Sequence, residues 1–248
     1  MKPAFLFQRP QHLHLAWLAV VLTAVALPIA GMMFAASRGS VAQAPIVGAI
    51  LSVSLMGAGM IGAAASGRLW VGVLVALVTG AGALFVGHGL EVWPVGYPLS
   101  LMLVIVIASV SFAVRGALFA RSAGDKGWWI ALGVVSGEAA MLATASALPG
   151  ALPDGLLVLL PAQWANVALQ NAFTGAGACA GSAVLLALGG TAAATWIVIR
   201  LWPRRWPYLI MFTAWLGLSA LVWHESTDAG VPDVSAQSGM AARLAGAP

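Results

Sequence analysis

The sequence predicts an all-α polytopic membrane protein. We expect a bundle of seven transmembrane helices, with an extra interfacial or re-entrant helix before the sixth span. Of the 248 residues, 61% are hydrophobic and only 7% are charged. Several apolar runs reach about twenty residues, the length that crosses a hydrocarbon layer roughly 30 Å thick. These observations exclude a water-soluble globule with one buried core.

Seven apolar windows lie between charged residues or turns rich in Pro and Gly, and we expect one crossing in each. The tail 225–248 is rich in Ala, Gly, Ser, Pro and Asp without apolar periodicity, so we expect it to be disordered. Residues 1–224 then form a single domain. The predicted spans are Leu15–Ala36, Gln43–Ala65, Leu69–Gly89, Pro98–Ala120, Gly127–Leu148, a segment within Thr174–Ile199, and Pro207–Trp223.

The placement of Lys and Arg predicts the orientation of the chain, because cytoplasmic loops carry an excess of these residues. With a cytoplasmic N-terminus, only Arg38 and Arg243 of the eleven basic residues fall outside. The C-terminus is then periplasmic or extracellular, and we expect a bacterial cytoplasmic (inner) membrane. The inner side collects the other nine, Lys2, Arg9, Arg68, Arg115, Arg121, Lys126, Arg200, Arg204 and Arg205.

The segment Leu156–Phe173 is too long to belong to the sixth span, and a further crossing would put Arg200 on the wrong side. Gln163, Asn166 and Gln170 recur at helical spacing, which places three amides on one face. The segment is therefore predicted to be an interfacial or re-entrant helix on the outer side.

Glu138 is the predicted polar centre, because it is the one carboxylate in the span Gly127–Leu148. It lies about 16 Å from the inner membrane boundary, and Arg115 in the preceding span lies about 9 Å from the same boundary. An acidic group at this depth is costly, faces the interior or a wet cavity, and normally has a partner.

Two interpretations of Glu138 stay open. It is either a proton-accepting or cation-binding group, or a structural group that is ion-paired with Arg115 or bonded as a neutral acid to Ser136, Thr144 or a backbone carbonyl. The spacing Gly133-x-x-x-Gly137 predicts that a neighbouring helix packs against the face that carries Glu138.

A second candidate site lies at the outer face, where His88 and Glu91 follow the third span and His224 and Glu225 follow the seventh. Two imidazoles and two carboxylates suit a divalent metal if these helix ends adjoin, with the Gln163–Gln170 helix as a roof. The simpler interpretation is that all four are solvated residues at helix ends.

Met56 and Met60 share a helix face and are weak candidates for Cu(I), although methionine more often fills gaps in a core. No catalytic signature or phosphate-binding loop is present, so the sequence leaves open whether the protein is an enzyme. The histidines lie at span ends and the lysines outside them, which disfavours haem and excludes a retinal Schiff base. No cofactor is assigned.

Ser136-Gly137-Glu138, the later Pro149, Pro153 and Pro161, and Asn171 are loosely similar to a pattern in subunit III of the haem-copper oxidases. That family also has seven helices, an N-in/C-out orientation and a glutamate inside an apolar helix. Its glutamate belongs to the third span, whereas Glu138 belongs to the fifth. We transfer no function from this resemblance.

We therefore expect either a small transport or permeation unit or a membrane-embedded subunit of a larger complex, with Glu138 as its polar centre. The alternative is a membrane-embedded enzyme or metal-handling protein with the outer-face His/Glu site. The lipid bilayer is the expected partner, with other membrane subunits or a second copy as further candidates. Nucleic acid is not an expected partner, because the basic residues are scattered through short loops.

Overall fold

The computed structural model describes residues 9–37, 43–90, 98–148, 150–174, 182–202 and 206–229. It describes side chains for all of these except residues 9–12, 43–45, 206–208 and 225–229. Throughout this part of the chain the regular elements are helices. They are α1 (Arg9–Val21), the π-helix η1 (Leu22–Ala26), α2 (Leu27–Ser37), α3 (Gln43–Ser66), α4 (Leu69–Gly89), α5 (Pro98–Ala123), the 3-10 turn η3 (Gly124–Lys126), α6 (Gly127–Ala147), α7 (Asp154–Leu157), α8 (Pro161–Thr174), α9 (Ser182–Arg200) and α10 (Trp206–Ala229).

The all-α class is confirmed, and a helix lies in each predicted window. Five helical segments of the described residues are long and apolar enough to cross a membrane, so the chain is a helical membrane protein. One of the five, Pro98–Ala147, contains both α5 and α6 because η3 joins them directly. The five are Leu13–Ser37, Ile46–Ser66, Leu69–Gly89, Pro98–Ala147 and Ser182–Arg200, and Leu209–His224 is a shorter apolar helix.

Helix α10 continues to Ala229, five residues into the predicted tail. Residues 230–248 of the predicted tail lie outside the described residues. The segment predicted as one helix over Leu156–Phe173 is two, the short α7 and the longer α8. Pro161 explains the break, because proline lacks an N–H and is best accommodated where a helix begins.

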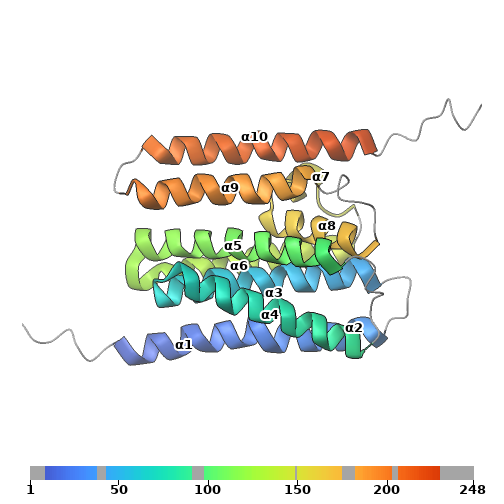
Figure 1. Cartoon of the computed structure of the whole chain (residues 1–248), viewed down its shortest axis with the longest axis horizontal. Coiled ribbons are helices and arrows are strands. Elements are labelled where there is room, and N and C mark those ends of the chain that lie inside the picture. Colours follow the sequence, from blue (N-terminus) through green and yellow to red (C-terminus); the bar gives the residue numbers. More distant parts are fainter. Residues whose placement is uncertain are drawn as a thin grey trace, which may run out of the picture.

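The long helices lie side by side along one axis (Figure 1). The first span, which consists of α1, η1 and α2, and helix α10 lie at opposite edges. The turns after α3 and α5 lie at one end of the bundle, which we call the η3 end. The end at which α2, α4 and α6 finish, and near which α7 lies, is the α7 end (Figure 1). Large apolar side chains remain exposed along the first span, α4 and α10, as contact with lipid requires.

Helix α3 is the centre of the packing, because every residue from Leu51 to Ala64 is buried. The first span, α4, α5, α6 and α8 all contact it. Glycines allow these helices to approach closely. A Cβ at Gly57 would lie 2.6 Å from Cβ of Thr23 in η1, and one at Gly116 in α5 would collide with the backbone carbonyl of Met60.

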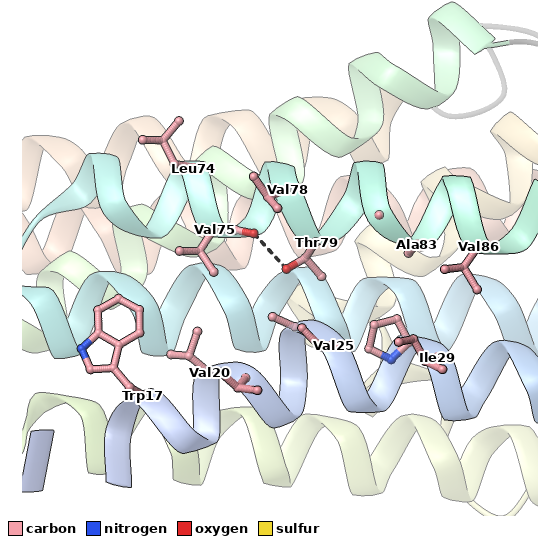
Figure 2. A pocket seen from close by; sticks show the side chains of 14 residues that line it. Trp17, Val20, Val25, Ile29, Leu74, Val75, Val78, Thr79, Ala83 and Val86 are labelled. Carbon is pink, nitrogen blue, oxygen red and sulfur yellow. Dashed lines mark hydrogen bonds between the residues drawn. The ribbon is translucent and has the colours of Figure 1, made fainter. Parts of the chain in front are cut away.

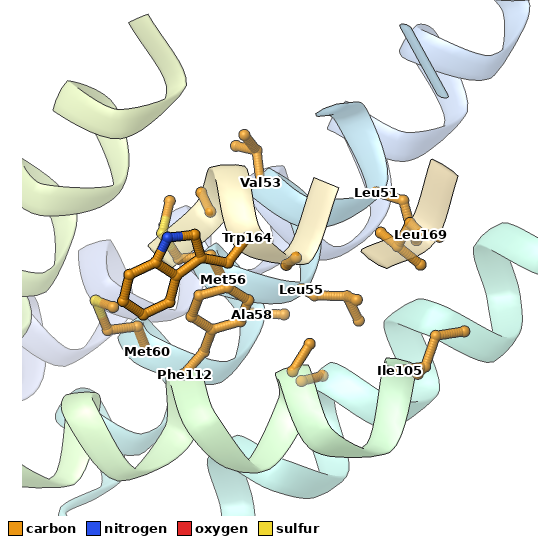
Figure 3. Close-up of a cluster of buried hydrophobic side chains, with 14 of the residues drawn as sticks. Leu51, Val53, Leu55, Met56, Ala58, Met60, Ile105, Phe112, Trp164 and Leu169 are labelled. Carbon is orange, nitrogen blue, oxygen red and sulfur yellow. The ribbon is translucent and has the colours of Figure 1, made fainter. Parts of the chain in front are cut away.

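Met56 and Met60 of α3 are both fully buried and belong to the main cluster of buried side chains. Phe112 of α5 and Trp164 of α8 belong to the same cluster (Figure 3). The two thioethers therefore fill the core between helices, the ordinary role of methionine.

The first span changes helical type in its middle. The N–H of Leu27 bonds to the carbonyl of Leu22, five residues earlier, and defines the π-helix η1. Pro28 follows, and its ring would crowd the carbonyl of Ala24 in a regular α-helix. The wider turn relieves this clash, as π-bulges do inside helices.

Gly116→Ala is expected to lower the free energy of unfolding by about 1–3 kcal/mol, because the added methyl group must displace the α3 backbone. Unfolding in detergent, followed by circular dichroism, measures this change. Gly133→Ala on α6 is the matched control, since a Cβ there meets nothing within 4 Å. Equal stability of the two variants would show that close packing at Gly116 does not hold α5 against α3.

Candidate functional site

Glu138 lies on the buried face of α6. Four further buried residues of this helix precede and follow it at intervals of three and four residues: Trp128, Ala131, Val135 and Leu142. That spacing forms a single stripe along a helix. Only 9% of Glu138 is exposed, so the prediction that it faces the interior agrees with its position.

The partner of Glu138 is the first turn of α8. Oε2 of Glu138 accepts a hydrogen bond of 2.8 Å from the backbone N–H of Ala162, which is fully buried. The first N–H groups of any helix lack partners inside that helix, and the helix dipole makes this end positive. The carboxylate therefore satisfies a donor and a partial positive charge that would otherwise be stranded inside the bundle.

Helix α8 is an interior element. It packs against α3, α5, α6 and α9, and eight of its fourteen residues are buried. Trp164 holds its start, because the indole N–H donates to the carbonyl of Val158 over 2.6 Å. Its burial favours the re-entrant location over the interfacial one, because a helix lying in the membrane surface would leave one face uncovered.

Gln163, Asn166 and Gln170 share a face of α8, as their spacing predicts. The amide of Asn166 donates to Oε1 of Gln163 over 3.1 Å, and the amide of Gln170 donates to Oδ1 of Asn166 over 2.8 Å. Gly48 of α3 faces this ladder, since a Cβ there would lie 2.6 Å from Oδ1 of Asn166. We call these three residues the amide ladder.

Arg115 points from α5 to α9. Its Nη2 donates to Oγ1 of Thr191 over 2.7 Å, and its guanidinium carbon lies 5.8 Å from the centre of the Phe112 ring. Its Nη1 is buried and has no hydrogen-bond partner among the described residues. Thr195, one turn beyond Thr191, donates to the carbonyl of Thr191 over 2.7 Å.

The direct ion pair between Arg115 and Glu138 is not formed. Their charges are close enough to interact, but each polar group bonds elsewhere, to α9 and to α8. Nor does Thr144 bond to Glu138, since its hydroxyl donates to the carbonyl of Ala140 in its own helix. The two groups therefore interact through space and do not form a direct ion pair.

The prediction that a neighbouring helix packs against Gly133 and Gly137 is wrong. Both glycines are exposed on α6, and a Cβ at either position would meet nothing within 4 Å. They lie on the face away from the buried stripe, because residues 133 and 137 are out of register with residues 131, 135 and 138.

The outer-face His/Glu site is not assembled by the described residues. His88 and His224 are both exposed near the α7 end. However, α4 packs against α3 and α5, whereas α10 packs against α9 on another side of the bundle (Figure 1). Glu91 lies outside the described residues, and so does the side chain of Glu225.

No metal ligand set is found either. Among the described residues, no group of three or more His, Cys, Asp and Glu side chains lies close enough together to hold a metal ion. Met56 and Met60 belong to the main cluster of buried apolar side chains, which agrees with a packing role in the part of the chain that the structure describes.

The sequence analysis missed two groups of this site, the N–H of Ala162 and the hydroxyl of Thr191. Pro161 was a usable signal for the first, because proline is common at the first position of a helix. The spacing of Thr191 and Thr195 within an apolar span was a signal for the second, since i and i+4 share a helix face.

Comparison of the chain with protein-family models, with curated proteins and with solved structures yields no match. The fold and the site define the class: a helical membrane protein with a buried polar centre. That centre holds a carboxylate, a guanidinium and the start of a buried half-length helix.

Glu138→Ala is expected to lower the free energy of unfolding by about 1–3 kcal/mol, because it leaves the N–H of Ala162 unsatisfied. Glu138→Gln should cost clearly less, since the amide keeps an oxygen acceptor of the same size. Thermal unfolding of both variants in one detergent compares them. If both variants matched the native protein, the bond from Ala162 to Glu138 would contribute nothing to stability.

Proposed function

We propose that this protein is a small transport unit that moves protons through the helical bundle, with Glu138 as the group that accepts and releases the proton. The supporting observation is the buried carboxylate of Glu138, placed midway along α6 and bonded to the start of α8. Ionisable groups at this depth are rare and generally functional. Half-length helices that begin inside a bundle form the sites of many membrane transporters.

Polar groups extend from Glu138 in both directions. Toward the α7 end, the amide ladder of α8 follows directly after Ala162. Toward the η3 end, Arg115, Thr191 and Thr195 form a seam between α5 and α9. Polar groups with bonding capacity left over can hold water, and water between them is the medium through which a proton would reach Glu138.

The chemistry of the site favours a proton over a metal cation. A metal ion prefers several carboxylate or imidazole ligands, and among the described residues Glu138 belongs to no group of three or more His, Cys, Asp and Glu side chains that could hold one. The positive charge of Arg115 also repels a metal ion. Protonation of Glu138 preserves its bond to Ala162, because a carboxylic acid keeps a carbonyl oxygen as acceptor.

The proposal includes the seven-crossing topology with a cytoplasmic N-terminus. Its crossings are the first span, α3, α4, α5, α6, α9 and α10, all of which run along the long axis of the bundle (Figure 1). Arg68, Lys126 and Arg200 lie at the η3 end, which is then cytoplasmic. Helix α8 is then the half-helix of a re-entrant segment, in which the chain enters the bundle from the outer side and returns to that side.

Glu138→Gln is expected to reduce proton flux to the level of protein-free liposomes, because an amide cannot take up a proton from water near neutral pH. Purified protein is reconstituted with a pH-sensitive dye inside the liposomes, and a potassium diffusion potential drives the flux. Asp125→Asn is the matched control, since this exposed carboxylate lies in the η3 turn and should be dispensable.

Unchanged flux in correctly folded Glu138→Gln would overturn the transport proposal. The subunit hypothesis makes a different prediction for the same preparation, because partner chains would then accompany the protein in mild detergent. In that case the Glu138→Gln change would alter stability or assembly alone.

The topology predicts that residues 204 and 228 lie on opposite sides of the membrane. Single cysteines at these positions, introduced as Arg204→Cys and Asp228→Cys in a Cys179→Ala background, are labelled with a membrane-impermeant maleimide. Position 228 should react in intact cells, and position 204 only after the membrane is opened. Labelling of both from one side would contradict an odd number of crossings before the C-terminus.

A further inference from the structure

A groove of about 500 Å³ runs between the first span and α4 (Figure 2). Its first wall extends from Trp17 to Ile29, and its second from Leu74 to Val86. Each wall covers twelve helical steps, or about 18 Å at 1.5 Å per residue. The groove is therefore long and narrow, and it follows the direction of the helices.

Small residues make the groove deep. Ala24, Gly82 and Ala83 line it, and a Cβ at Gly82 would meet nothing within 4 Å. Larger side chains such as Val25 and Val78 stand beside them (Figure 2). The π-helix η1 and Pro28 lie in the first wall, so the widened turn of the first span helps to shape the hollow.

The groove offers almost no polar group to a ligand. Thr79 lines it, but its hydroxyl already donates to the carbonyl of Val75 over 2.8 Å (Figure 2). The other lining side chains are hydrocarbon, apart from the indole of Trp17. A ligand that fits this surface is a hydrocarbon chain, since any polar group would lose its hydrogen bonds to water without replacement.

The dimensions suit one chain. A methylene is close in size to a water molecule, which occupies roughly 30 Å³, so the volume of about 500 Å³ holds about seventeen such groups. That is the size of one ordinary lipid acyl chain. A volume of about 500 Å³ spread over about 18 Å gives a mean cross-section of about 28 Å², or about 6 Å across. A transmembrane helix of a partner is too wide to enter, because an α-helix with side chains is about 10–12 Å across.

The groove also has a suitable end for a lipid headgroup. The first span contacts α4 mainly through η1 and α2, so the two walls diverge toward the η3 end, where Trp17 and Leu74 lie (Figure 2). Tryptophan favours the interface between membrane and water. Arg68 is exposed at the start of α4, at this same end, and its charge complements a lipid phosphate.

We propose that the groove is a binding site for one acyl chain of a membrane phospholipid, with the phosphate at the η3 end near Arg68. The bound chain fills the space between the first span and α4. This site is separate from Glu138, and it does not depend on the proposed transport of protons.

Photo-crosslinking tests the site directly. The full chain is reconstituted in liposomes of phosphatidylcholine and phosphatidylglycerol, the latter carrying a diazirine in its acyl chain. After illumination, mass spectrometry locates the adducts. We expect adducts to concentrate within residues 17–29 and 74–86, at higher density than along the lipid-exposed stretch 209–223 of α10.

Gly82→Phe should fill the groove and reduce its adducts to the density found on α10. Gly133→Phe is the matched control, because Gly133 is also an exposed helical glycine with open space around it and lies outside the groove. Circular dichroism and gel filtration confirm that both variants fold.

An even distribution of adducts, or adducts in the groove that survive Gly82→Phe, would overturn the proposal. Efficient disulfide formation between two copies that carry Gly82→Cys in a Cys179→Ala background would overturn it too, because a second chain would then be the occupant. Arg68→Gln tests the contact with the lipid headgroup separately from the contact with the acyl chain. We expect weaker retention of phosphatidylglycerol in native mass spectrometry, with the acyl-chain adducts in the same place.

Discussion

The hydrogen bond between Glu138 and Ala162 joins two features that are each costly inside an apolar bundle. A carboxylate at this depth loses its hydration, and a helix that begins there leaves N–H groups without water. Each feature supplies what the other lacks, because the carboxylate accepts and the first turn of α8 donates. The position of α8, and with it the amide ladder, depends on this contact.

Helix α3 provides the frame in which that contact forms. It is buried along its middle, and its neighbours approach it through glycines such as Gly57 and Gly116. In hydrocarbon, helices gain little from hiding apolar surface, so close contact between backbones takes over the role of the hydrophobic effect. The space left on one side of α3 is wide enough for α8, whose Asn166 lies against Gly48.

Much of the fold was predictable because hydropathy varies along the chain with the long helices. Long apolar stretches such as Leu69–Gly89 became helices with the expected bounds. The spacing of Gln163, Asn166 and Gln170 also predicted a shared helix face correctly. In contrast, Gly133 and Gly137 suggested a packing groove where α6 is exposed, because a small-residue motif shows that a helix can approach without showing that one does.

The candidate site was predictable only in part. A lone carboxylate in an apolar helix identified Glu138 as the polar centre, but its partner was not readable from the chain. Arg115 had the right charge and a long side chain, yet it bonds to Thr191 on α9. Similarly, His88 and His224 lie at the same end of the bundle, on helices that pack in different places.

The sequence by itself determined the helical class, the approximate extent of the long helices and the depth of each polar group along its own helix. Only the tertiary structure decided which helices are neighbours, and therefore that Glu138 meets Ala162 and that the first span leaves a groove beside α4. The physical reason is that depth follows from counting residues along a helix. Which helices become neighbours depends on how helices of similar composition fit together, and small differences in side-chain shape decide that fit.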